Sequence, residues 1–198
     1  MNSDHKLIFD TETSGLPSRS HSSHYTNLDQ YSTCRLLSIS WIILNKSNDI
    51  VLKNTYYIIP DNFDISTKSI EIHGLTKDIL TEKGITIHNF VHHLNTILNT
   101  YNITHLIAHN INFDINVIKS ELHRYAYLNT LDKINNKSLF CTMINSKKQI
   151  GLSKWPKLAE AYRHYYNDEI TNAHDAEFDT LYCYKVFLKL YQYYSDLF

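Results

Sequence analysis

The stretch HKLIFDTETSGLP, residues 5–17, decides the fold prediction, because an apolar run leads directly into two carboxylates. Residues 5–10 have the composition of a buried β-strand, whereas Asp10 and Glu12 carry charges that are costly to remove from water. Along a strand, residues i and i+2 point to the same face, so Asp10 and Glu12 share one face and Thr11 takes the other. Two adjacent anions need a compensating cation, and a divalent metal ion suits oxygen ligands.

A lone Asp-x-Glu pair is more often a solvated strand end than a metal site, but further acids follow at similar places. Asp114 falls on the first turn of the helix that follows the apolar stretch LIAHN, residues 106–110. His174 and Asp179 lie at the entry to the last expected helix. Each of these, taken alone, is an ordinary residue of a helix start. Together, these additional residues make a metal site at Asp10 and Glu12 a stronger candidate than the lone pair does.

The order of the expected elements indicates an α/β domain with a mixed sheet. The turn-forming sequence KSND, residues 46–49, predicts a hairpin between two β-rich runs. We expect one domain over residues 1–198, with a long polar loop at 18–33. The expected strands cover residues 5–10, 34–45, 49–60, 104–110 and 137–142, and the expected helices fall within 66–76, 77–82, 86–101, 112–128, 155–166 and 175–194.

Composition and charge exclude several classes of protein. The chain has 198 residues, of which 43% are hydrophobic and 20% charged, with no apolar run long enough to cross a bilayer and no secretory signal at the start. Cys34, Cys141 and Cys183 form no C-x-x-C motif, which favours a reducing compartment and argues against a zinc site. We expect a soluble intracellular protein, in cytoplasm or nucleus, without a membrane partner. A net charge of −1 limits any nucleic-acid contact to a short, local one.

Four segments in order resemble the motifs of the DEDDh exonucleases, the DnaQ-like 3′→5′ exonucleases with a ribonuclease-H-like fold. They are FDTETSGL (9–16), HGLT (73–76), LIAHNINFD (106–114) and HDAEFD (174–179). The resemblance covers about residues 5 to 190 and implies a ribonuclease-H-like, mixed five-stranded sheet flanked by helices. The sister subfamily has a tyrosine where this chain has Asp175, so His174 assigns the chain to the h-type.

The resemblance implies a catalytic set in this chain. Asp10, Glu12, Asp114 and Asp179 would hold two divalent ions, Mg²⁺ or Mn²⁺, and His174 would be the general base. Two metal ions stabilise the attacking and leaving oxygens of a phosphodiester, and histidine exchanges protons near neutral pH. On a continuous helix, five residues turn through about 500°, so His174 can reach the same site as Asp179 only if it precedes the helix.

The resemblance also implies residues that hold the terminal nucleotide. Leu16 would wedge against a base and His73 would read the 3′-hydroxyl, because apolar surfaces bind bases without reading their identity. The alternative for Leu16 and Phe113 is core packing, and for His73 it is a helix-end histidine bonded to a carbonyl. The implied substrate-binding residues are Thr13, Leu16, His73, Gly74, Asn110 and Phe113.

The predicted function is metal-dependent 3′→5′ hydrolysis at the 3′ end of single-stranded nucleic acid, with DNA favoured, releasing nucleoside 5′-monophosphates. One alternative is an exoribonuclease that trims RNA ends, because discrimination depends on contacts to the 2′-hydroxyl. The others are a non-catalytic nucleic-acid-binding module of the same fold and a structural partner in a larger complex. Phe198 follows the last expected helix closely, which favours a stand-alone trimming nuclease over an obligate polymerase subunit. Protein partners and oligomeric state stay open.

Overall fold

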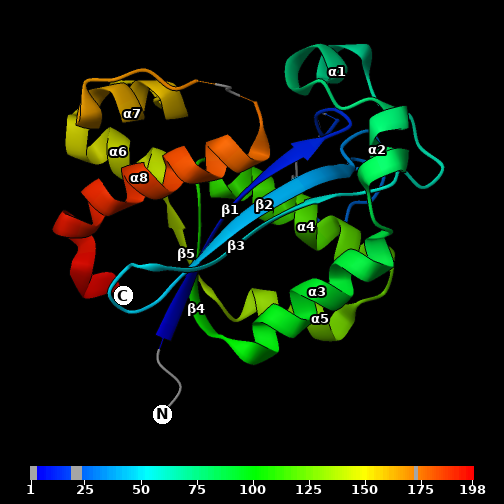
Figure 1. The fold of residues 1–198 in the computed structure, drawn as a ribbon, viewed down its shortest axis with the longest axis horizontal. Helices are drawn as coiled ribbons and strands as arrows, with labels where there is room; N and C mark the ends of the chain where they lie inside the picture. Colours follow the sequence, from blue (N-terminus) through cyan, green and yellow to red (C-terminus); the bar gives the residue numbers. More distant parts are fainter. Residues whose placement is uncertain (1–3, 19–23, 172–173) are drawn as a thin grey trace.

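The computed structural model describes residues 4–18, 24–171 and 174–198 and consists of a five-stranded mixed sheet with helices on both faces (Figure 1). The order of the strands across the sheet is β3-β2-β1-β4-β5. The predicted fold class, a mixed five-stranded α/β sheet, is confirmed. The strands are β1 (Asp4–Thr13), β2 (Leu36–Leu44), β3 (Ile50–Tyr57), β4 (Asn102–Ala108) and β5 (Ser138–Cys141).

The first three strands form an antiparallel meander, and β4 and β5 run parallel to β1. The predicted hairpin between β2 and β3 is confirmed. Its turn contains Asn48 with φ of 67°, a left-handed conformation that asparagine tolerates better than most residues. β1 is therefore central, with an antiparallel neighbour on one side and a parallel neighbour on the other.

Local capping explains where several helices begin and end. Ser66, Thr76 and Thr86 each accept a hydrogen bond from the backbone N–H three residues later. Gly74, at φ of 73°, ends the first helix in the left-handed conformation that glycine favours. The helices are α1 (Thr67–His73), α2 (Lys77–Lys83), α3 (Ile87–Thr100), α4 (Ile111–Arg124), α5 (Leu128–Asn135), α6 (Thr142–Ile150), α7 (Leu158–Tyr166) and α8 (Ala176–Tyr194), followed by the short 3₁₀ helix η1 (Ser195–Leu197).

The structure corrects the sequence prediction at three places. β1 runs to Thr13 instead of ending at Asp10, so both carboxylates lie within a paired strand. The single helix expected over 112–128 ends at Arg124, and Ala126 has φ of 57°, which no α-helix accommodates. α5 and α6 were not predicted as separate helices. α6 begins directly after β5 and has no side-chain hydrogen bond at its N-cap, so it carries no local start signal.

The polar loop predicted at 18–33 is only partly described. Residues 24–33 form turns and bends and contain no helix or strand, as expected, whereas residues 19–23 lie outside the described residues. Among the described residues, no helix has the length and apolar character needed to cross a membrane.

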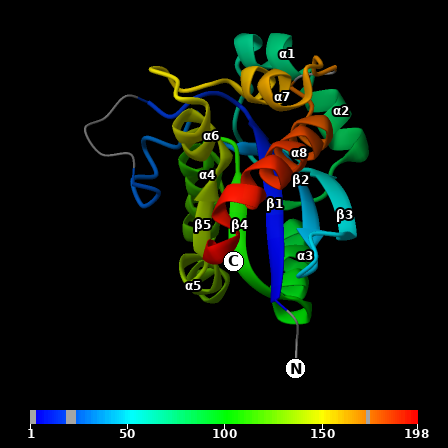
Figure 2. The same cartoon turned by 90° about the vertical axis from the view of Figure 1, so that its left-hand side faces the viewer.

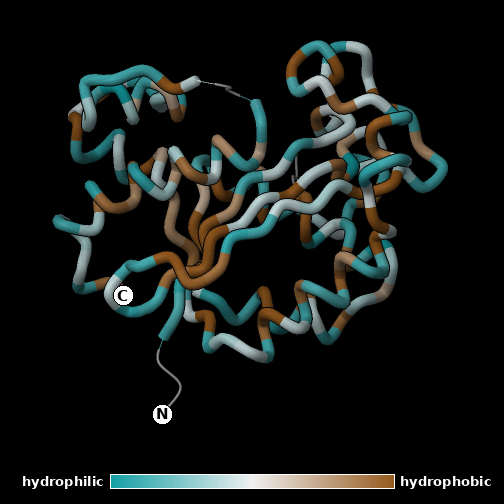
Figure 3. Tube along the Cα trace, in the orientation of Figure 1, coloured by the Kyte–Doolittle hydropathy of each residue, from teal (hydrophilic) through white to brown (hydrophobic). Residues whose placement is uncertain are grey.

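Side-chain alternation along β1 divides the core into two layers. Leu7 and Phe9 pack with α3, α4 and α5 on one face, and Ile8 packs with α7 and α8 on the other. Figure 2 shows α8 crossing in front of β1 and β2. Apolar residues follow the strands through the centre of the molecule (Figure 3). Continuing the same alternation sends Asp10 and Glu12 to the face covered by α8.

A buried ion pair fixes α4 to the start of β2. Arg35 Nε donates to Glu121 Oε1 at 2.6 Å, and a second guanidinium nitrogen donates to Oε2 at 3.0 Å. The backbone N–H of Leu36 also donates to Glu121 Oε1, at 3.2 Å, and the Arg35 guanidinium stacks on Phe63. The backbone N–H of Arg35 donates to the hydroxyl of Ser14. The pair therefore connects α4, β2 and the chain that leaves β1.

We predict that Glu121→Ala lowers the free energy of unfolding by about 3–5 kcal/mol, because it leaves a buried guanidinium without its counter-charge. Urea unfolding followed by circular dichroism measures this. The matched control is Glu169→Ala, which removes the partner of Arg163 from an exposed ion pair and should leave the midpoint unchanged. Equal unfolding midpoints for the two variants would show that the buried ion pair stabilises the fold no more than the exposed one does.

Candidate active site

Three carboxylates from two elements meet at the carboxyl end of β1. Asp10 and Glu12 project from β1 toward α8, where Asp179 lies in the first turn. One carboxylate oxygen from each residue lies within 4.8 Å of the other two. The partners of Asp10 and Glu12 on β2 are Ser40 and Ser38, whose small side chains leave room for the acids. The convergence of these three acids follows from strand alternation together with the packing of α8.

Asp114, the fourth predicted acid, is buried at the start of α4 and is not part of this group of three. Its Oδ1 accepts hydrogen bonds from the backbone N–H of Thr11 at 3.1 Å and from the Thr11 hydroxyl at 2.7 Å. Thr11 points to the α4 face because it lies between Asp10 and Glu12 in the strand. Thr11 thus contacts α4 through Asp114, while its neighbours Asp10 and Glu12 approach Asp179 of α8. A role for Asp114 as a metal ligand stays a prediction.

His174 precedes α8, as the spacing predicted, since the helix begins at Ala176 after the N-cap Asp175. Its φ is 68°, and its backbone N–H donates to Asp179 Oδ2 at 3.0 Å. The side chain is exposed and lines the adjoining cavity. Residues 172 and 173, just before it, lie outside the described residues. Its backbone therefore orients an acid while its imidazole faces the cavity.

The carboxylates raise one another's affinity for protons. Burial, followed by repulsion from Asp114, Asp179 and Glu12, raises the pKa of Asp10 well above its usual range. Burial raises the pKa of Glu12 to about 8, with Asp179 the largest of the repelling charges. Burial also raises the pKa of Asp114 to about 7, although the hydrogen bonds from Thr11 oppose the rise. The site without a cation is therefore destabilised by its own charge at neutral pH.

The donor set fits divalent cations. Among the described residues, Asp179 Oδ1 is buried and accepts no hydrogen bond, although its sister oxygen accepts one from His174. A buried carboxylate oxygen without a donor is costly unless a cation neutralises it. The ligand atoms of this group are carboxylate oxygens, and such sets suit Mg²⁺, Mn²⁺ or Ca²⁺. The structure thus contains a candidate metal centre made by Asp10, Glu12 and Asp179.

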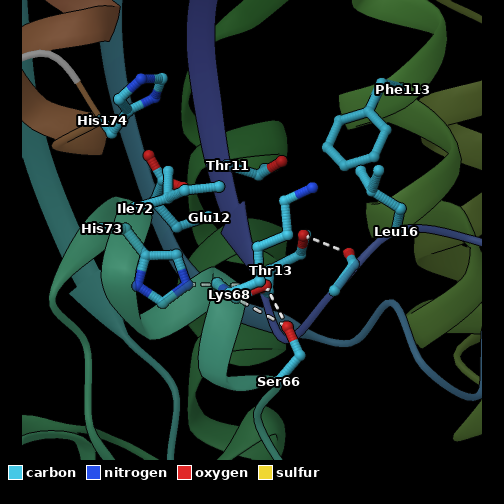
Figure 4. A pocket seen from close by; sticks show the side chains of 12 residues that line it. Thr11, Glu12, Thr13, Leu16, Ser66, Lys68, Ile72, His73, Phe113 and His174 are labelled. Carbon is cyan, nitrogen blue, oxygen red and sulfur yellow. Dashed lines mark hydrogen bonds between the residues drawn. The ribbon is translucent and has the colours of Figure 1, made fainter.

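A cavity of about 550 Å³ opens beside the acids, between the end of β1, α1 and the start of α4. Glu12 and His174 lie on one side of it, and Leu16 and Phe113 lie on the other in Figure 4. Leu16 is 74% exposed, which excludes core packing as the explanation for this residue. The cavity thus presents the Glu12 carboxylate and the His174 imidazole opposite an apolar wall.

Four of the six predicted substrate-binding residues line the cavity in the structure. Thr13, Leu16, His73 and Phe113 line the cavity, whereas Gly74 and Asn110 are not among the described residues that do. Gly74 instead ends α1. His73 Nε2 lies 3.2 Å from the carbonyl of Thr13, and its Nδ1 accepts from the N–H of Leu75 at 3.0 Å. Both ring nitrogens are thus used by the backbone, the arrangement considered as the alternative.

Sequence reasoning missed several contributors to this region. Thr11 orients Asp114, and its place on the strand face opposite the two acids was a signal that could have found this role. Asp175 adds to the repulsion on Asp10 and Glu12 from the N-cap of α8. Lys68 and Ile72 line the cavity from α1, and no motif in the sequence marked them.

The exonuclease family model, of the RNase T type, matches residues 7–187. The chain belongs to this exonuclease family. The predicted recognition is confirmed, and the enzyme class, a nuclease, follows from it. Exonucleases of this family depend on divalent metal ions, in agreement with the acidic centre. A comparison with curated protein sequences finds no match.

Solved structures of exonuclease I share the fold. The E. coli enzyme in complex with a dT13 oligonucleotide has 18% sequence identity and a TM-score of 0.70, and the match covers 96% of this chain and 41% of that one. The E. coli enzyme with a 5cy-dA13 oligonucleotide gives 17% identity, a TM-score of 0.69 and coverage of 96% and 40%. A product-bound exonuclease I has 16% sequence identity and a TM-score of 0.71, and the match covers 96% of this chain and 44% of that one. This exonuclease chain therefore spans less than half the length of those relatives.

We predict that the metal-free exonuclease loses stability as pH rises from about 5 to 8. Glu12 and Asp114 bind protons more tightly in the folded state, so the folded chain holds more protons in this window and rising pH favours unfolding. Differential scanning fluorimetry in chelator should show a fall in Tm of several degrees, and millimolar Mg²⁺ should remove it.

The control is Asp179→Asn, which removes one charge from the group. This variant should show a smaller fall with pH and a smaller rise with Mg²⁺. A metal-free Tm that is constant or increases between pH 5 and 8 would contradict the electrostatic account.

Proposed function

We propose that this chain is a divalent-metal-dependent 3′→5′ exonuclease that hydrolyses single-stranded nucleic acid, DNA in preference to RNA, and releases nucleoside 5′-monophosphates. The observation that carries the proposal is the convergence of Asp10, Glu12 and Asp179 on one point at the edge of a cavity that also contains His174. The presence of single-stranded oligodeoxynucleotides in the E. coli exonuclease I structures supports DNA as the substrate.

In this proposal, the four carboxylates of Asp10, Glu12, Asp114 and Asp179 hold two ions, Mg²⁺ or Mn²⁺. When bound, such ions supply positive charge for the phosphate and for the entering and leaving oxygens. The group of three would contribute most ligands, while Thr11 holds Asp114 in a fixed orientation beside them.

His174 would accept the proton of the attacking water. Its exposed imidazole faces the cavity, and its backbone hydrogen bond to Asp179 keeps it beside the metal centre. Histidine suits this step because it exchanges protons near neutral pH. Transfer of the proton to bulk water is then direct, since the ring is exposed.

The terminal nucleotide would occupy the cavity of about 550 Å³, with its base against Leu16 and Phe113. Such a surface binds any base through its apolar face, which fits an enzyme that removes successive nucleotides regardless of sequence. His73 would act by positioning: its ring holds the Thr13 carbonyl and the Leu75 N–H, which fixes α1 against the end of β1. The backbone near Gly74 and the side chain of Asn110 would contribute at the margin of the cavity.

We predict that wild-type protein with Mg²⁺ or Mn²⁺ shortens a 5′-labelled single strand stepwise from its 3′ end, and that chelator stops the reaction. Asp10→Asn should abolish the ladder because it removes a charge from the metal centre. His174→Ala should lower kcat about 10²–10⁴-fold, the usual contribution of a general base. Fragments from internal cuts, or an active Asp10→Asn, would reject the proposal.

Parallel reactions on DNA, RNA and duplex of one sequence separate the alternatives. Faster shortening of RNA would assign the exoribonuclease function. If the protein binds nucleic acid but hydrolyses it with none of the divalent metal ions tested, it is a non-catalytic nucleic-acid-binding module.

Leu16→Ala should raise KM about tenfold on any sequence, equivalent to about 1.4 kcal/mol of lost binding, with little change in kcat. Leu139→Ala is the matched control, because Leu139 is also exposed but lies on β5 outside the cavity. A KM that rises equally in both variants would place the base elsewhere.

A further inference from the structure

The connection between α6 and α7 carries a basic and aromatic surface that the proposed reaction does not use. Residues 147–157 contain four lysines, and the segment 141–159 contains no acidic residue, although the whole chain has a net charge of −1. Trp155 lies in this connection with 54% of its surface exposed, which is unusual for an indole. Cations are therefore concentrated beside an exposed aromatic ring.

These groups surround a surface hollow of about 460 Å³. The Lys147 ammonium lies 4.0 Å from the centre of the Trp155 ring, and Lys148 is exposed at the rim. Within the part of the chain that the structure describes, Lys148 makes no ion pair. The hollow is lined by Ile144, Lys147, Lys148, Gly151, Leu152 and Trp155.

A half-buried histidine joins this connection to the edge of the active-site region. His109 Nε2 lies 3.0 Å from the carbonyl of Pro156, and its Nδ1 lies 3.0 Å from the hydroxyl of Thr142 at the start of α6. His109 directly precedes Asn110 and α4, whose Phe113 and Asp114 belong to the active-site region. The ring therefore holds the residue next to Trp155 against the turn between β4 and α4.

We propose that the hollow at Trp155 binds the single strand upstream of the 3′ end, with one base against the indole and phosphates on Lys147 and Lys148. This inference rests on the proposed function, because it extends the path of the same substrate beyond the terminal nucleotide.

Charge and surface chemistry favour this occupant. Single-stranded nucleic acid is bound through backbone phosphates on cations and bases on aromatic side chains, and every base has a face that can stack. The exposed indole, Lys147 on the same ring and the exposed Lys148 provide both types of contact. The resulting surface is short. This agrees with the net charge of −1, which is too low for the protein to bind a long stretch of nucleic acid.

The two tryptophans of the chain provide a direct measurement. Trp41 is fully buried, so added nucleic acid that touches the surface changes the emission of Trp155. We expect a thymidine 20-mer, with Ca²⁺ replacing Mg²⁺ to suppress turnover, to quench this emission, and a thymidine dimer to have no effect. A uridine 20-mer in a parallel titration separates DNA from RNA. Absence of quenching by both 20-mers would overturn the inference.

Charge and ring variants then test the roles of the residues. Lys148→Glu should weaken binding of the 20-mer at least threefold and reduce the slope of log affinity against log salt by about 0.7, the value for one lost phosphate contact. Lys46→Glu is the matched control, because Lys46 lies in the exposed β2–β3 turn. Equal weakening by the two variants would reduce the effect to net charge and refute a local site.

Trp155→Ala should raise KM for the 20-mer about tenfold, leave kcat unchanged and leave hydrolysis of the dimer unchanged, whereas Trp155→Phe should retain wild-type KM. Tyr193→Ala, on the exposed end of α8, controls for loss of a surface ring. An equal loss on both substrate lengths would reject the second site. If wild-type protein hydrolyses neither substrate, the proposed function fails, while quenching that Lys148→Glu weakens would still support nucleic acid at Trp155.

Discussion

Repulsion among poorly hydrated carboxylates is the constraint on which the rest of this structure depends. Asp10, Glu12 and Asp179 bring oxygens within 4.8 Å of one another, and their pKa values rise because burial and repulsion from neighbouring acids both oppose ionisation. Rigid elements hold this arrangement, and bound protons or a cation lower its repulsion. The central strand supplies two of the acids, and the first turn of the longest described helix supplies the third.

β1 joins the two layers of the molecule to one site. Its odd-numbered residues pack toward α4, and its even-numbered residues face α8, so Thr11 binds Asp114 while Asp10 and Glu12 approach Asp179. A register change of one residue would exchange the two faces and remove the site. The pairing of β1 with strands on both sides fixes that register.

Two histidines near the site, His73 and His109, use their ring nitrogens to hold neighbouring segments in place. His109 is partly exposed, but desolvation of its ring lowers its pKa to about 4, so it remains neutral, with Nε2 at the Pro156 carbonyl and Nδ1 at the Thr142 hydroxyl. His73 likewise uses both nitrogens on the backbone, which fixes α1 to β1. His174 differs because its ring is exposed toward the cavity. Hydrogen-bond partners, which only coordinates reveal, thus separate three histidines of similar appearance in the sequence.

The sequence by itself determined the strand–helix order, the hairpin and the family, because apolar periodicity and the four spaced motifs are local properties of the chain. It also determined that His174 precedes a helix, since the turn angle per residue is fixed. Only the tertiary structure decided that β1 continues through both acids, that His73 is occupied by backbone groups and that Trp155 is exposed. These features depend on contacts between segments distant in sequence, and no local pattern encodes which partner a strand, a ring nitrogen or an indole meets.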